Sequence, residues 1–156
     1  MPHLDRILLA EDNPTDIELT LRALIGLANK VDVARDGAEA LDYLYCRGLF
    51  ANRLPGNPAL VVLDNRMPRI DGLEVLKRIR TDAKLKKIPV IMLTASREHG
   101  DFLKSHALGV HGYVIKPVNF CEFVTAVRDL GVRWAIVTEP PSDSLPTGSR
   151  RLQAAC

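Results

Sequence analysis

The feature that most constrains the fold is a regular alternation of short apolar segments with longer segments of helical periodicity. The short segments have strand length and lie at 6–12, 30–36, 59–64, 88–95 and 111–117. The segments that follow them repeat apolar residues every third or fourth position, at 13–29, 37–48, 71–87, 97–109 and 119–137. Nearly continuous apolar strands are typical of a parallel sheet that helices cover on both faces.

This alternation predicts one α/β domain with five parallel strands and five helices. Each crossover between parallel strands should be right-handed. Five strands with five helices favour the doubly wound, flavodoxin-like strand order 2-1-3-4-5. The sequence therefore predicts an open sheet whose carboxyl edge carries the functional site.

Several helix starts carry recognisable capping residues. Asn13 is a good N-cap before a proline, and Asp71 is the expected cap of segment 71–87. Two further pairs have the spacing of a capping box, namely Asp36 with Glu39 and Asn119 with Glu122. In segment 13–29, the expected apolar face consists of Ile17, Leu21, Leu24, Ile25 and Ala28.

Length and composition indicate an ordinary globular chain. The 156 residues suggest one domain, which we expect over 1–137, followed by a Pro- and Ser-rich tail over 138–156 that extends as an arm and then becomes disordered. A net charge of +2 gives no reason to expect nucleic acid or a membrane as a partner. The N-terminus has no signal segment, and three widely spaced cysteines suggest reduced thiols, so we expect a cytoplasmic protein.

Polar side chains follow the apolar strands at the point where each strand ends. Glu11 and Asp12 end the first strand, Asp64 the third, Thr94 the fourth and Lys116 the fifth. Because the carboxyl ends of parallel strands meet at one edge, these side chains should converge there. The histidines at 99, 106 and 111 lack ligand spacing to these acids, and we expect them to be solvated.

This set of side chains suits phosphoryl chemistry with a hard cation. Three clustered carboxylates repel one another unless a cation intervenes, and Mg²⁺ prefers such oxygen ligands. A carboxylate such as Asp64 can act as a nucleophile toward phosphorus and form an acyl phosphate. The oxygens of the transferred group then need positive charge, which Mg²⁺ and Lys116 can supply, and Thr94 can donate a hydrogen bond.

Four motifs in order carry a family resemblance: AEDN, VLDNRMPRIDG, MLTAS and GYVIKP. Over residues 5 to 130 the chain resembles the receiver domain of two-component response regulators. The resemblance implies that Asp64 accepts a phosphoryl group from a histidine kinase in a phosphorelay. It also implies that Glu11, Asp12, Asp64 and the backbone carbonyl of Arg66 bind Mg²⁺.

The resemblance extends to the conformational switch. It implies that Thr94 moves toward the phosphoryl group while the ring of Tyr113 turns inward, and that the Lys116–Pro117 peptide bond is cis. The chain departs from the family at position 65, which is usually apolar and is Asn65 here. Arg66 and Ser96 occupy positions that tune phosphoryl lifetime in the family.

A closer resemblance links the chain to the stand-alone receivers that are paired with bacterial phytochrome kinases. It depends on RDGAEALDYLY, on the long loop 47–58 and on the extension RWAIVTEPP. In that subgroup the chain after the last helix can pair with a second subunit. Residues 134–141, with Trp134, Ile136 and Val137, would form such a dimer arm and give a homodimer.

Three other functions compete with the phosphorylated switch. An Asp-nucleophile phosphohydrolase needs a second Asp two residues after the first, and Arg66 stands there. A flavodoxin-like cofactor carrier needs a Gly-, Ser- or Thr-rich loop where this chain has the acidic EDNPTD. A phosphorylation-independent scaffold would not need the complete set of acids, Thr and Lys. We therefore expect that the protein is not an enzyme and that it assists only its own phosphorylation and dephosphorylation.

Overall fold

A computed structural model describes residues 5–27, 29–105, 108–128 and 130. Its strands are β1 (Ile7–Ala10), β2 (Val31–Ala34), β3 (Leu60–Asp64), β4 (Val90–Thr94) and β5 (Gly112–Ile115). Its helices are α1 (Pro14–Ala23), α2 (Gly37–Leu44), α3 (Gly72–Thr81), α4 (Arg97–Ser105) and α5 (Phe120–Val127), with a 3-10 turn η1 (Gly48–Phe50) after α2. The predicted alternation of strands and helices is confirmed.

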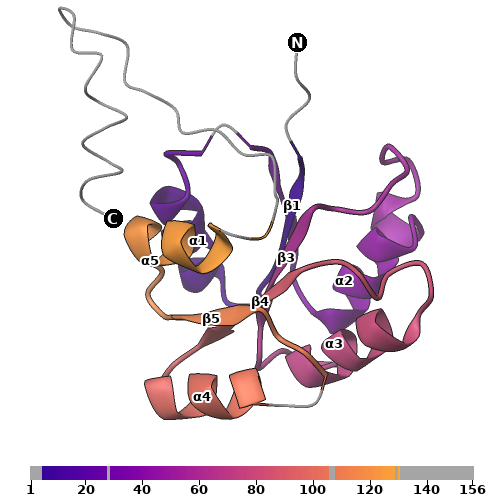
Figure 1. The fold of residues 1–156 in the computed structure, drawn as a ribbon. Helices are drawn as coiled ribbons and strands as arrows, with labels where there is room; N and C mark the ends of the chain where they lie inside the picture. The colour runs from indigo at the N-terminus through magenta and orange to yellow at the C-terminus, as the bar shows by residue number, and fades with distance from the viewer. Residues whose placement is uncertain (1–4, 28, 106–107, 129, 131–156) are drawn as a thin grey trace, which may run out of the picture.

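The strands form one parallel sheet in the order β2-β1-β3-β4-β5, as predicted. In Figure 1, α1 and α5 cover one face of the sheet and α2 and α3 cover the other. Helix α4 packs against β4 and the edge strand β5. The strand order reverses at the pair β1–β3, so the carboxyl ends of these two strands lie side by side.

The buried residues divide into two clusters, one on each face of the sheet. Along β1, Leu8 packs on the α2–α3 side, and Ile7 and Leu9 pack on the α1–α5 side. The neighbouring β3 repeats this pattern, with Val61 on the first side and Val62 on the second. Since both faces are covered by helices, the strands read as continuous apolar runs in the sequence.

All five helices end earlier than predicted, α1 at Ala23, α2 at Leu44, α3 at Thr81, α4 at Ser105 and α5 at Val127. Helix α1 ends at Ala23 and buries Ile17 and Thr20. Leu24 and Leu27, which follow the helix, are also buried. Leu21 and Ile25 are 36% and 79% exposed, so the expected apolar face is wrong at these positions. Helix α3 ends at Thr81 because Asp82 is extended and its carboxylate accepts a hydrogen bond from the Lys84 N–H, which starts a turn.

The predicted N-caps are confirmed. Asn13 accepts hydrogen bonds from two backbone N–H groups of α1, and Asn119 does the same for α5. Asp36 and Asp71 each accept one N–H bond, at α2 and α3. These bonds satisfy the otherwise unpaired N–H groups of the first helical turn.

The remaining predictions concern the C-terminal tail, the cysteines and membrane association. The domain boundary at 137/138 and the residues Trp134, Ile136 and Val137 lie outside the described residues. Cys46 is a free cysteine but Cys121 is disulfide-bonded, so the prediction of reduced thiols is wrong for Cys121. Within the described part of the chain, no helix is long and apolar enough to cross a membrane.

Candidate functional site

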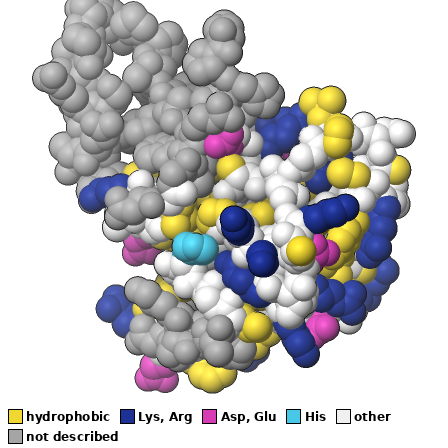
Figure 2. Space-filling view, turned by 45° about the vertical axis from the view of Figure 1, so that its right-hand side comes forward, with side chains coloured by type: hydrophobic (Ala, Val, Ile, Leu, Met, Phe, Trp, Pro, Cys, Tyr) yellow, Lys and Arg dark blue, Asp and Glu magenta, His cyan; other side chains and the backbone are white. Residues whose placement is uncertain are grey.

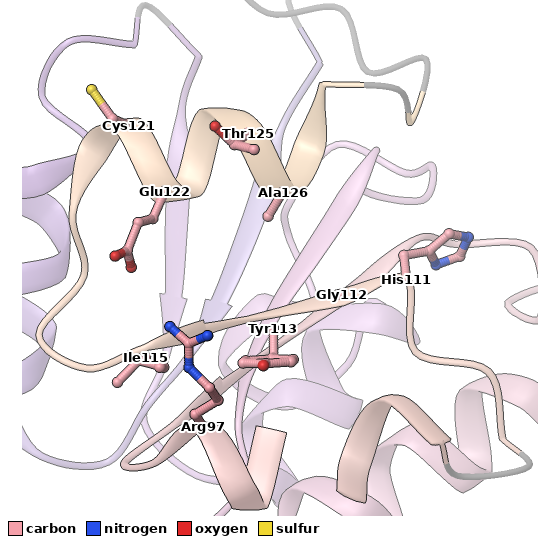
Figure 3. A pocket seen from close by; sticks show the side chains of 9 residues that line it. All are labelled: Arg97, His111, Gly112, Tyr113, Ile115, Cys121, Glu122, Thr125 and Ala126. Carbon is pink, nitrogen blue, oxygen red and sulfur yellow. The ribbon is translucent and has the colours of Figure 1, made fainter. Parts of the chain in front are cut away.

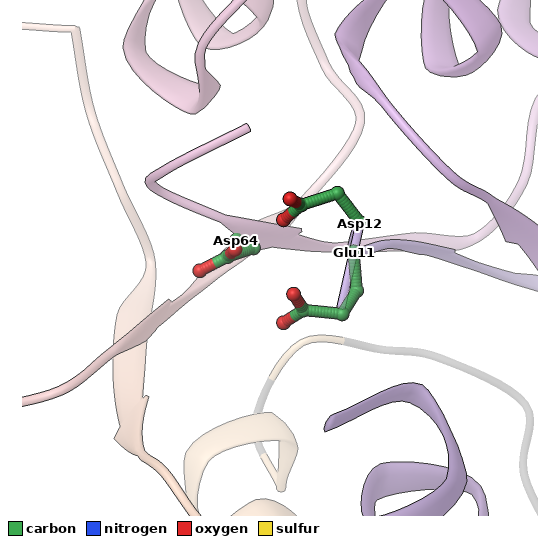
Figure 4. A group of neighbouring side chains, drawn as sticks. All are labelled: Glu11, Asp12 and Asp64. Atoms are coloured by element: carbon green, nitrogen blue, oxygen red, sulfur yellow. The ribbon is translucent and has the colours of Figure 1, made fainter. Parts of the chain in front are cut away.

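Three carboxylates meet at the carboxyl edge of the sheet. Glu11 and Asp12 follow β1, Asp64 is the last residue of β3, and one oxygen of each lies within 4.8 Å of the others. Figure 4 shows the three side chains turned toward a common space at the ends of these strands. The convergence predicted from the strand ends is thus present among these acids.

The loop after β3 holds Asp64 at this edge. The backbone N–H of Asn65 donates to Leu93 O over 3.4 Å, and Asn65 O accepts from Gly72 N over 2.9 Å. A Cβ atom at Gly72 would overlap the carbonyl oxygen of Asp64, so only glycine lets α3 start this close to the strand end. Asp64 itself is 4% exposed.

Lys116 is the cation that the chain itself supplies to these acids. Its Nζ lies 2.8 Å from Glu11 Oε2, 3.0 Å from Asp64 Oδ1 and 3.2 Å from Asp16 Oδ2. Burial alone would lower the pKa of Lys116, but its hydrogen bonds to Glu11 and Asp64 outweigh burial and raise that pKa above its usual range. Lys116 therefore stays charged, and its peptide bond to Pro117 is cis, as the resemblance implies.

Glu11 is the most buried of the acids, with no exposed surface. Burial raises its pKa to about 7, although the hydrogen bond to Lys116 acts in the opposite direction. Its Oε1 accepts a hydrogen bond from Asn13 N, and its Oε2 lies 2.8 Å from the ammonium of Lys116. Both oxygens of this buried carboxylate therefore have a partner, and one of the two partners is a cation.

The acidic cluster fits a hard divalent metal ion. All three side chains offer oxygen atoms, which Mg²⁺ prefers, and no soft sulfur or imidazole ligand belongs to the cluster. Asp12 is half-buried and keeps one side of the cluster in contact with solvent. Mg²⁺ usually retains several waters and takes one or two carboxylates, which an open site of this kind allows.

Thr94 and Tyr113 occupy different surroundings. Thr94 is 2% exposed, and its hydroxyl donates to Ser96 O over 3.2 Å. Tyr113 is half-buried, and its ring packs so closely on α4 that a Cβ at Gly100 would overlap it. Figure 3 shows this ring beside Arg97, in a cavity of about 610 Å³ between α4, β5 and α5.

A second cavity, of about 520 Å³, lies directly beside Asp64. It is lined by residues of the β3–α3 loop, the end of β4 and α4, together with Lys116. His99 is one of these lining residues, and its Nε2 lies 2.6 Å from Asn65 Nδ2. The expectation that His99 is merely solvated is therefore wrong.

Asp16 and His99 are the two site residues that sequence reasoning missed. Asp16 follows the acidic pair in the first turn of α1, where it reaches Lys116. Its position one helical turn after a strand-end acid is a signal that could have found it. For His99 the sequence offers no comparable signal, because its partner Asn65 is 34 residues away. Arg66 lies next to the site in the same loop, with its side chain exposed.

The surface away from the acids is rich in basic side chains. Figure 2 shows Lys and Arg over much of the side that carries α2 and α3, with fewer Asp and Glu among them. Exposed basic residues of α3 and the turn after it include Lys77, Arg78, Lys84, Lys86 and Lys87. The acidic cluster at the strand ends and this basic surface are thus separate features of the domain.

The sequence matches one protein family over most of its length. Residues 7–128 match the response regulator receiver domain. The chain belongs to this family. It is therefore a receiver domain of the response regulators, which are signalling proteins of two-component systems, and the resemblance based on the four motifs is confirmed.

Relatives of this receiver include phytochrome response regulators. The bacteriophytochrome response regulator AtBRR is 54% identical, with a TM-score of 0.81, over 88% of this chain and 100% of its own. The phosphorylated cyanobacterial phytochrome response regulator RcpA is 38% identical, with a TM-score of 0.66, over 81% of this chain and 90% of its own.

A third relative carries a metal ion. Response regulator Rcp1 from Synechocystis sp. is 33% identical over 82% of this chain and 87% of its own length. Its Mn²⁺-bound structure has a TM-score of 0.66 and covers 88% of this chain and 99% of that one. The closer resemblance to phytochrome-linked receivers is thus confirmed as a resemblance.

Proposed function

We propose that Asp64 is the phospho-acceptor of this receiver and that its phosphorylation switches a protein-binding surface. The observation that carries the proposal is the position of Asp64, which is buried at the sheet edge with Lys116 Nζ 3.0 Å from its Oδ1 and two further acids beside it. Such a carboxylate is held in place, has a fixed cation and faces a cavity that can admit a phosphoryl donor.

In the proposed reaction, a carboxylate oxygen of Asp64 attacks the phosphorus of a phosphohistidine on a sensor kinase. A P–O bond forms and the P–N bond breaks, and the electron pair of that bond returns to the histidine nitrogen. Lys116 stabilises the charge that remains on the phosphoryl oxygens. Hydrolysis later reverses the modification, when water attacks phosphorus, the P–O bond to Asp64 breaks, and inorganic phosphate and a proton leave.

Glu11, Asp12, Asp64 and the backbone carbonyl of Arg66 would hold Mg²⁺. When bound, this ion would neutralise charge on the phosphoryl oxygens. Support comes from the oxygen-only cluster and from the Mn²⁺-bound form of Rcp1. Glu11 and Asp12 also set the negative charge that makes the site selective for a divalent cation.

Thr94 and Tyr113 would convert phosphorylation into a surface change. The Thr94 hydroxyl, which donates to Ser96 O here, would turn to a phosphoryl oxygen, and the Tyr113 ring would turn inward. The cavity between α4, β5 and α5 lies next to this ring and would change shape with it.

The partner that we propose is a sensor histidine kinase of the phytochrome class, because AtBRR and RcpA are described as phytochrome response regulators. Residues 134–141 would pair with a second subunit and give a homodimer. Such a kinase would meet the chain in the cytoplasm. We expect no turnover of external phosphoesters, since Arg66 stands where a hydrolase would need its acid.

Labelling by acetyl phosphate with Mg²⁺ tests the proposal. The wild-type protein should gain one phosphoryl group by intact-mass spectrometry, and Asp64→Asn should gain none. Asp71→Asn is the matched control, because Asp71 is an exposed cap in the same loop, and it should be labelled like the wild type. Equal labelling of Asp64→Asn and the wild type would contradict the proposal.

A further inference from the structure

A hydrogen bond joins the residue after Asp64 to helix α4. Asn65 Nδ2 lies 2.6 Å from His99 Nε2, so the amide donates and the ring nitrogen accepts. We call this contact the Asn65–His99 bridge. It links the loop that carries the phospho-acceptor to the first turn of the helix that packs on β5.

Both ends of the bridge are held in place. The backbone of Asn65 is bonded on one side to Leu93 O and on the other to Gly72 N. The backbone N–H of His99 donates to Ser96 Oγ over 3.2 Å, and its ring stacks on Phe102 with centroids 6.0 Å apart. A hydrogen bond between two fixed residues resists their separation, because neither partner can follow the other.

The bridge crosses the cavity beside Asp64. On the loop side this cavity is lined by Asp64, Asn65 and Arg66, and on the helix side by Ser96, Glu98, His99 and Phe102. A phosphoryl group on Asp64 would enter this space. A movement of α4 away from the loop in response to the group would therefore break the bridge.

Thr94 makes a second connection of the same kind. Its hydroxyl donates to Ser96 O, which also accepts the Gly100 N–H at the start of α4. With this hydroxyl turned to α4 instead of the acids, the structure has the arrangement expected before phosphorylation. The Asn65–His99 bridge belongs to the same arrangement and stabilises it.

We propose that Asn65 and His99 are positioning residues that hold α4 in the position it has before phosphorylation. They thereby lower the affinity of the site around Asp64 for a phosphoryl group or its mimic. The inference rests on the proposed function. A ligand that binds one of two states has its apparent affinity reduced by the fraction of molecules in that state. Loss of a hydrogen bond that exists only in the resting state raises that fraction and so tightens binding.

Beryllofluoride with Mg²⁺, a mimic of the phosphoryl group, tests this inference when it is titrated into the full chain by calorimetry. Asn65→Leu and His99→Leu should each bind it about five-fold more tightly than the wild type, the effect of one net hydrogen bond. His99→Gln should stay near the wild type, because the Gln amide oxygen can accept from Asn65. The double variant should bind no more tightly than either single Leu variant.

Asn57→Leu is the matched control. It also removes a side-chain hydrogen bond of an asparagine, from Asn57 Nδ2 to Lys84 O, but in an exposed loop away from the cavity. It should leave the affinity unchanged. The ring ¹⁵N signal of His99 adds a direct readout, since it should shift in Asn65→Leu and not in Asn57→Leu.

Unchanged or weaker binding by the folded Leu variants would overturn the inference, and so would additive effects in the double variant. These results leave the proposed function intact as long as the wild type binds the mimic and is labelled by acetyl phosphate. If the wild type does neither, the proposed function fails, and the inference fails with it.

Discussion

The ammonium of Lys116 lies 3.0 Å from Oδ1 of Asp64, and their side chains are only 20% and 6% exposed. The same nitrogen lies 2.8 Å from the fully buried Glu11. One cation thus compensates the two most buried acids of the site. Removal of one partner of a buried ion pair is costly because it leaves an uncompensated charge behind.

Lys116→Met should therefore impair both stability and labelling. We expect the free energy of unfolding at pH 8 without Mg²⁺ to fall by about 2 kcal/mol, less than for a fully buried pair because Lys116 is partly exposed. Labelling by acetyl phosphate should slow at least about ten-fold. Urea denaturation and intact-mass kinetics measure the two effects.

The control for that variant is Lys30→Met. Lys30 is 65% exposed and lies 4.0 Å from Asp32, so its loss should change the free energy of unfolding by less than about 0.5 kcal/mol. A similar loss of stability in both variants would show that the buried position of Lys116 has no special weight.

Mg²⁺ binding should strengthen as pH rises through 7. The pKa of Glu11 is raised to about 7 by burial, so its carboxyl group carries a proton at pH 6 that the metal must displace. Affinity should increase about ten-fold between pH 6 and pH 8 if Glu11 is a ligand. Calorimetry measures this change, and in Glu11→Gln the affinity should be weaker and nearly independent of pH.

The stability of the metal-free protein should show the opposite trend. Below pH 7 the folded protein keeps a proton on Glu11 that the unfolded chain, with a usual pKa of 4.5, releases. Because the folded state then binds more protons, stability should fall as pH rises from about 4.5 to about 7, by about 2–3 kcal/mol from this group. Urea denaturation in EDTA, compared with Glu11→Gln, isolates this contribution. A flat difference between the two proteins would contradict it.

The strand-end residues could be predicted from the sequence because topology alone brings them together. Once five apolar runs alternate with helices, the strand order brings the end of β1, with Glu11 and Asp12, beside Asp64 at the end of β3, whatever the side-chain packing. Lys116 follows β5 and reaches the same acids with its long side chain.

Residues on the helices could not be predicted in this way. Whether His99 faces the site depends on how α4 is rotated on the sheet, and side-chain packing sets that rotation. The same cause explains the error in α1, where Thr20 is buried and Leu21 is 36% exposed. An apolar pattern with residues on two faces does not say which face the sheet covers.

Gly100 illustrates the same limit and leads to a last prediction. Its presence in the sequence weakens the expected helix, yet α4 continues through it, and the Tyr113 ring packs where a side chain would lie. Gly100→Ala should destabilise the protein by about 1–3 kcal/mol, since the ring must move. In a Tyr113→Ala background the same change should stabilise it by about 0.5–1 kcal/mol through helix propensity. Urea denaturation of the four proteins closes the cycle, and equal effects in both backgrounds would mean that the ring does not pack on Gly100.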